Sequence, residues 1–128
     1  MKKLLPILCL AALSAATLVR ADHHVQATGT FAGKSDHVTT GTASIVKTEG
    51  GYSVVLGEDF SLDGAPDPKV GLGKDGYKKE TKLGKLQSKS GRQSYAIPAE
   101  IDPSNYNEVW IWCERFNVPL GVATLEAK

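Results

Sequence analysis

The chain has 128 residues, enough for one domain around a single hydrophobic core, and 41% of its residues are hydrophobic. Its 15 basic and 14 acidic residues give a net charge of +1, but three of the basic residues and none of the acidic ones lie in the first 21 positions, so residues 22–128 carry a net charge of −2. Binding to nucleic acid needs a clear cationic surplus, so we do not expect a nucleic-acid partner.

The first 21 residues predict a secretory signal peptide. Lys2 and Lys3 precede an apolar run over residues 4–19, and a small-residue cleavage pattern ends at Ala21. The run is shorter than the roughly 20 residues that a membrane-spanning helix needs. We therefore expect cleavage after Ala21, with cleavage after Ala27 as the alternative, and no stable membrane span afterwards. The mature chain is expected in the periplasm or outside the cell.

After a flexible lead-in predicted over residues 22–27, residues 28–128 have the pattern of one β domain. Short runs rich in Val, Ile, Thr, Tyr and Trp alternate with Gly, Pro, Asp and Asn, and Glu49-Gly50-Gly51 predicts a tight hairpin turn. Strands are predicted over residues 28–31, 42–47, 52–56, 82–86, 93–97, 108–113 and 122–125. Because no helical period separates them, we expect an all-β fold, a single antiparallel β-sandwich.

Residues 57–75 are rich in turn-forming residues and predict an ordered loop with one short strand near residues 70–72. Loops on β scaffolds often bind ligands, so Pro66 and Asp67 are candidate binding residues. Residues 71–76 have the letters of a dinucleotide-binding fingerprint but lack the buried strand before it and the helix after it. We therefore interpret this stretch as a loop. The basic residues that follow, from Lys74 to Arg92, predict a solvated face or a patch for an anionic surface.

Cysteine is the most informative residue type in this chain. Cys9 lies in the signal peptide, so Cys113 is alone in the mature chain and cannot form an internal disulfide. Its open roles are a buried core residue, a disulfide-linked dimer, a metal ligand or a redox-active thiol. In an extended strand, Trp110 and Trp112 project to the side opposite Cys113, which makes these two tryptophans candidate binding residues.

The histidines offer one conditional metal site. Cleavage after Ala21 would expose Asp22-His23-His24 as a new amino terminus, where the amine, two backbone amides and the His24 imidazole can enclose Cu(II) in a square-planar set of nitrogens. His37 lies in a polar loop and is expected to be solvated, unless the fold brings it to Cys113. Covalent haem and iron–sulfur clusters are not expected from this set of ligands, and no motif predicts an enzyme.

Several short phrases of the mature chain, taken in order, match the pattern of one known family. They are residues 41–43, 56–60, 64–70, 83–86, 91–98, 106, Val109-Trp110-Ile111-Trp112-Cys113, 116 and 121–125. Together they resemble the DM-thirteen domain of Skeletor-like extracellular proteins and exported bacterial proteins, over about residues 29–126. The resemblance implies a β-sandwich related to redox and to haem- or sugar-binding domains, with Cys113 at the position of the proposed redox cysteine.

The sequence thus supports two functions. The first is an exported domain with a redox or electron-transfer role centred on Cys113, which meets an unidentified redox partner outside the cytoplasm. The alternative is a non-catalytic binding or adhesion module for a small molecule, a glycan or a protein.

Overall fold

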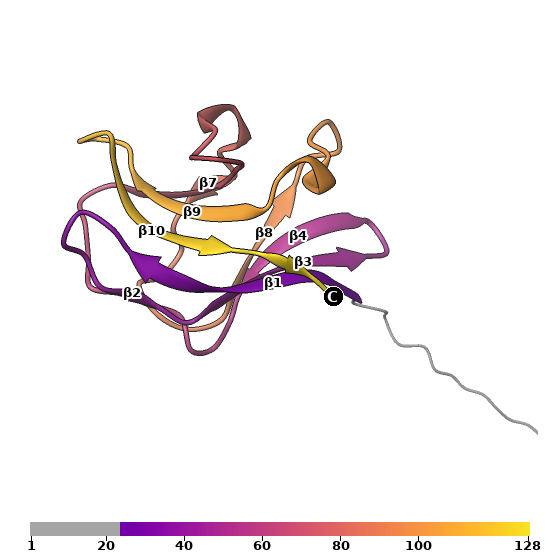
Figure 1. Ribbon diagram of the computed structural model, residues 1–128, viewed down its shortest axis with the longest axis horizontal. Helices are drawn as coiled ribbons and strands as arrows, with labels where there is room; N and C mark the ends of the chain where they lie inside the picture. The colour runs from indigo at the N-terminus through magenta and orange to yellow at the C-terminus, as the bar shows by residue number, and fades with distance from the viewer. Residues whose placement is uncertain (1–23) are drawn as a thin grey trace, which may run out of the picture.

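The computed structural model describes residues 24–128, shown as a ribbon in Figure 1. The predicted signal peptide and residues 22 and 23 lie outside the described residues. Within this range no helix is long and apolar enough to cross a membrane. Eleven strands and two single-turn 3-10 helices make up the described elements: β1 (His24–Gly33), β2 (Thr39–Thr40), β3 (Thr42–Thr48), β4 (Gly51–Leu56), β5 (Ser61–Leu62), β6 (Pro68–Gly73), η1 (Lys79–Thr81), β7 (Gly84–Lys85), β8 (Gln93–Ile97), η2 (Pro103–Asn105), β9 (Glu108–Cys113), β10 (Val118–Thr124) and β11 (Glu126–Ala127).

Nine strands form one antiparallel sheet in the order β7-β6-β9-β10-β1-β3-β4-β8, with β11 also paired to β1, and β2 and β5 form a separate antiparallel pair. The sheet folds over at β1: residues 24–30 pair with β3, whereas Phe31, Ala32 and Gly33 pair with β10. One layer therefore contains β3, β4 and β8, and the other contains β10, β9, β6 and β7 (Figure 1). The predicted all-β antiparallel sandwich is confirmed.

Most predicted strands are present, but the two-residue strands β2, β5 and β11 were not predicted, and β10 begins at Val118 rather than at residue 122. The Glu49-Gly50 turn joins β3 and β4, with Thr48 paired to Gly51 as the hairpin predicts. Residues 24–27, expected within the lead-in, already belong to β1 and pair with β3 and β11. The strand expected over residues 82–86 is reduced to the two residues of β7, since η1 ends just before it.

The largest difference is at β6, because the short strand expected near residues 70–72 within a loop is a full strand over Pro68–Gly73 that lies between β7 and β9. Pro68 is the first residue of β6, a position where the missing N–H is tolerated. Gly71 and Gly73 lie inside the strand, and the turn follows at Asp75 and Gly76, which both have positive φ. The interpretation of residues 71–73 as a loop is therefore wrong.

The core fills the space between the two layers with alternate residues of each strand. In β9, Val109, Ile111 and Cys113 are buried and the residues between them are partly exposed. Val70 from β6 and Leu120 from β10 join them in the same hydrophobic cluster. This two-residue period fixes which side chains of β9 face the core and which face outward.

Candidate functional site

Strand β9 divides the candidate residues between its two sides. Cys113 is 1% exposed and belongs to the hydrophobic core. It pairs in register with Pro68 of β6 on one side and with Val118 of β10 on the other. The thiol is therefore enclosed by the sheet on both flanks and by core side chains on its inner side.

The outer side of β9 carries three aromatic rings, which we call the aromatic face: Tyr77, Trp110 and Trp112. The rings of Tyr77 and Trp112 are stacked, with centroids 4.7 Å apart and an interplanar angle of 19°. Trp110 meets Trp112 edge to face, with centroids 6.0 Å apart and an angle of 74°. All three side chains are partly exposed. Both packing geometries are those that aromatic rings favour.

Two glycines of β6 let the rings lie close to the sheet. A Cβ on Gly71 would come within 2.6 Å of Tyr77 Cε1, and a Cβ on Gly73 would come within 2.2 Å of the backbone oxygen of Gly76 and within 2.5 Å of Trp110 Nε1. Real Cβ atoms do not approach other heavy atoms so closely, so a side chain at Gly71 would push the Tyr77 ring outward, and one at Gly73 would displace both the turn at Gly76 and the Trp110 ring. Gly71 and Gly73, which have the letters of a nucleotide fingerprint, thus make room for these rings and for the turn instead.

Hydrogen bonds hold both indoles in place. Trp110 Nε1 donates to Glu108 Oε1 at 2.9 Å, and the same oxygen accepts from the backbone N–H of Gly76 at 3.0 Å. Trp112 Nε1 donates to Asn117 Oδ1 at 3.2 Å, in the turn between β9 and β10. The aromatic face is consequently a fixed surface whose indole donors are already satisfied.

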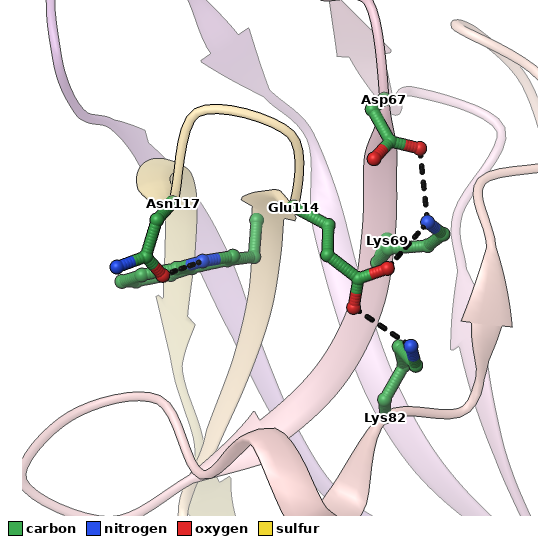
Figure 2. A network of polar contacts seen from close by, with 6 residues as sticks. Asp67, Lys69, Lys82, Glu114 and Asn117 are labelled. Carbon is green, nitrogen blue, oxygen red and sulfur yellow. Dashed lines mark hydrogen bonds and ion pairs between the residues drawn. The ribbon is translucent and has the colours of Figure 1, made fainter.

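Charged side chains border the aromatic face in what we call the ion-pair network, drawn in Figure 2. Lys69 Nζ lies 2.9 Å from both Asp67 Oδ1 and Glu114 Oε1, and Lys82 Nζ lies 2.7 Å from Glu114 Oε2. Hydrogen bonds from Lys82 and then Lys69 lower the pKa of Glu114 from 4.5 to about 2. The bonds to Glu114 and Asp67 in turn raise the pKa of Lys69.

A groove of about 560 Å³ runs beside the aromatic face. It is lined by Tyr77, Lys78, Lys79, Glu80, Trp112, Glu114 and Asn117. Burial raises the pKa of Tyr77, which keeps its hydroxyl neutral at physiological pH. The groove therefore combines an aromatic wall with mixed charges, as protein and ligand contact surfaces do.

The structure brings some of the candidate residues together and separates others. Trp110 and Trp112 pack against each other. Asp67 is ion-paired with Lys69, which also pairs with Glu114 in the lining of the groove. Pro66 is exposed and is not part of that lining. Cys113 lies on the opposite side of β9. Sequence reasoning missed Tyr77 and Lys69, because they approach β9 only through the pairing of β6, and it placed Lys82 in a basic stretch without its partner Glu114.

The two described histidines lie apart from β9. His24 is exposed at the start of β1 and pairs with Lys47 of β3, while Asp22 and His23 lie outside the described residues. His37 Nδ1 lies 2.8 Å from Asp63 Oδ1. Within residues 24–128, no group of three or more His, Cys, Asp or Glu side chains is arranged to hold a metal ion.

A comparison with known families gives the identity of this sandwich. The model of the family described as Electron transfer DM13 matches residues 30–125, from within β1 to the residue before β11. The chain belongs to the DM13 family. No curated protein and no solved structure matches it.

Membership of the DM13 family indicates a role related to electron transfer. The matched range includes Cys113 and all of the aromatic face. It also includes the glycines of β6 and the whole ion-pair network. Both sides of β9 are thus parts of the DM13 domain.

Proposed function

We propose that this chain is exported and serves electron transfer as a docking domain, which holds a redox partner against its aromatic face. The observation that carries the proposal is the fixed packing of Tyr77, Trp110 and Trp112 on the outer side of β9, beside the groove. Rigid aromatic rings are enriched at protein interfaces and contribute a large share of the binding energy there.

The burial of Cys113 favours a docking role over a role in which its thiol reacts. Thiol–disulfide exchange requires a thiolate to reach a second sulfur, and a residue with 1% exposure offers no such approach while β9 is paired. In the docking proposal the electron stays on the redox group of the partner, and Cys113 packs the core behind the aromatic face. The alternative proposal, in which Cys113 is itself the redox group, requires β9 to open.

The charge around the groove favours an acidic partner. Four lysines, Lys69, Lys78, Lys79 and Lys82, lie in or beside the groove, against three carboxylates, Asp67, Glu80 and Glu114, which leaves a small cationic surplus there. The carboxylate of Glu114 is already paired with two lysines. Because complementary charge steers association, we expect the partner to be an acidic one-electron carrier protein of the haem or copper class.

The experiment is a titration of the ¹⁵N-labelled mature chain with acidic haem and copper proteins from the host's extracytoplasmic fraction, added one at a time. Binding is expected to shift or broaden the indole N–H signals of Trp110 and Trp112, and the effect should weaken with added salt. Shifts confined to the layer of β3, β4 and β8, or the absence of binding by any of these carriers, would refute the proposal.

Matched variants locate the contact. Trp112→Ala is expected to weaken binding by at least about tenfold, the effect of a tryptophan at an interface hot spot. Lys79→Glu should weaken binding and reduce its salt dependence, whereas Lys47→Glu, the same charge change at an exposed lysine of β3, should leave both unchanged. Equal effects of the two lysine variants would show that the groove is not the contact.

A further inference from the structure

A second hollow, of about 390 Å³, lies between the first layer and the segment that leads into β9. Its wall comes from β1, β3, β4 and β11 on one side and from residues 102–107 on the other. The lining residues are Gln26, Ala27, Ile45, Tyr52, Asp102, Pro103, Ser104, Tyr106, Asn107, Leu125 and Ala127. A volume of this size is within the range of small-molecule sites, which often occupy the mouths of β-barrels and similar folds.

The hollow has an apolar inner wall that is continuous with the core. Ile45 and Leu125 are buried members of the main hydrophobic cluster. Ala27, Tyr52 and Tyr106 are partly buried and pack against that cluster. A ligand that entered the hollow would therefore place its apolar part on core side chains and on two tyrosine rings.

Asp102 contributes the one charged side chain among the lining residues. Its Oδ1 accepts hydrogen bonds from the backbone N–H of Ser104 at 3.0 Å and from Ser104 Oγ at 2.7 Å. The bonds from Ser104 lower the pKa of Asp102, so the carboxylate is ionised at neutral pH. Within residues 24–128, the ion pairs found involve other carboxylates, and none includes Asp102.

We propose that this hollow binds a small organic cation of the arylalkylamine class, with its ammonium group toward Asp102 and its ring against Tyr52, Tyr106 and Leu125. The negative charge of Asp102 in the lining is complementary to a cation, whereas Lys47, whose Nζ lies 6.0 Å from the centroid of the Tyr52 ring, is outside the lining and leaves that ring to the apolar part of the ligand. The inference goes beyond the docking function and stands independently of it, because no lining residue belongs to the aromatic face or to the groove.

The experiment compares three probes of similar size on the mature chain: 2-phenylethylammonium, neutral 2-phenylethanol and anionic 3-phenylpropionate. Binding is followed by the shifts of backbone signals of residues 102–107. The cation is expected to bind about two- to fivefold more tightly than the alcohol, as a partly exposed ion pair would provide, and the carboxylate most weakly.

The variant Asp102→Asn tests the negative charge of Asp102 separately from its role as the cap of η2. Asn is as good a helix cap as Asp, so η2 should remain while the negative charge is lost. The variant is expected to bind cation and alcohol equally, whereas Glu100→Gln, which removes an exposed carboxylate of the same segment outside the lining, should keep the preference.

A third variant tests the hollow itself. Ala127→Leu enlarges an exposed lining residue, so it should weaken the cation and the alcohol alike without disturbing the core. Equal affinity of the native chain for cation and alcohol, a preference that survives in Asp102→Asn, or a failure of all three probes to bind would each overturn the proposal.

Discussion

The accessibility of Cys113 decides between the two proposals for electron transfer, and a thiol reagent can measure it. Cys113 ends a strand that is paired along its length with β6 and β10, so the reagent reaches the sulfur only after that pairing opens. Central strands open with free energies close to that of global unfolding, which is typically ~5–15 kcal/mol. Even ~5 kcal/mol slows labelling more than ~10³-fold relative to the unfolded chain, since each 1.4 kcal/mol is a factor of ten.

The assay is the rate of reaction with Ellman's reagent for a chain that begins at Asp22, in native buffer and in guanidinium chloride. Such a chain contains no other cysteine, and Cys113→Ser should abolish the signal in both conditions. The same variant buries a hydroxyl in an apolar site and should lower the free energy of unfolding by about 1–3 kcal/mol. A native rate within tenfold of the unfolded rate would refute the argument from burial and restore Cys113 as the redox candidate.

Three further results are expected. Gly71→Ala should displace Tyr77 and cost about 1–3 kcal/mol of unfolding free energy with a changed near-ultraviolet circular dichroism spectrum, whereas Gly50→Ala, where a Cβ meets nothing within 4 Å, should not. Glu114 has a pKa of about 2 in the folded chain against 4.5 when unfolded, so its contribution to stability is complete above pH 4.5 and disappears as pH falls through 2. The melting temperatures of the native chain and Glu114→Gln should therefore differ at pH 6 and converge near pH 2; a gap that persists there would contradict the assignment. Amino-terminal sequencing should show that the exported chain begins at Asp22, and one Cu(II) should then bind and be lost in His24→Ala; a chain that begins at Thr28 would bind none.

The sequence predicted the fold class and the two sides of β9 because both depend on a local two-residue period. It predicted only a short strand near residues 70–72 where β6 spans Pro68–Gly73, because Pro68, Gly71 and Gly73 have the composition of a loop. Composition misleads there because the glycines make room for groups outside the strand: Gly71 for the Tyr77 ring after the following turn, and Gly73 for the backbone of that turn and for the Trp110 ring from the neighbouring strand.

The rest of the candidate site depends on pairs far apart in the chain. Lys69 and Glu114 are 45 residues apart and meet because β6 pairs with β9 in one particular register. A change of register by one residue would turn Lys69 toward the core and Val70 toward solvent. The burial of Cys113 also depends on residues far apart in the chain. The alternating pattern of β9 shows which side of the strand carries Cys113, but it does not show whether the other layer of the sandwich covers that side.

The hydrogen bonds of the two indoles also indicate which atoms of the aromatic face a partner would contact. Both indole N–H groups already donate within the domain, to Glu108 and Asn117, so a partner would contact ring carbon rather than compete for these donors. Burial of ring carbon is insensitive to salt and mainly slows dissociation, whereas the lysines of residues 74–92 act over distance and mainly speed association. The proposed docking face therefore separates the two rates physically: Trp112 governs how long a carrier stays, and Lys79 governs how quickly it arrives.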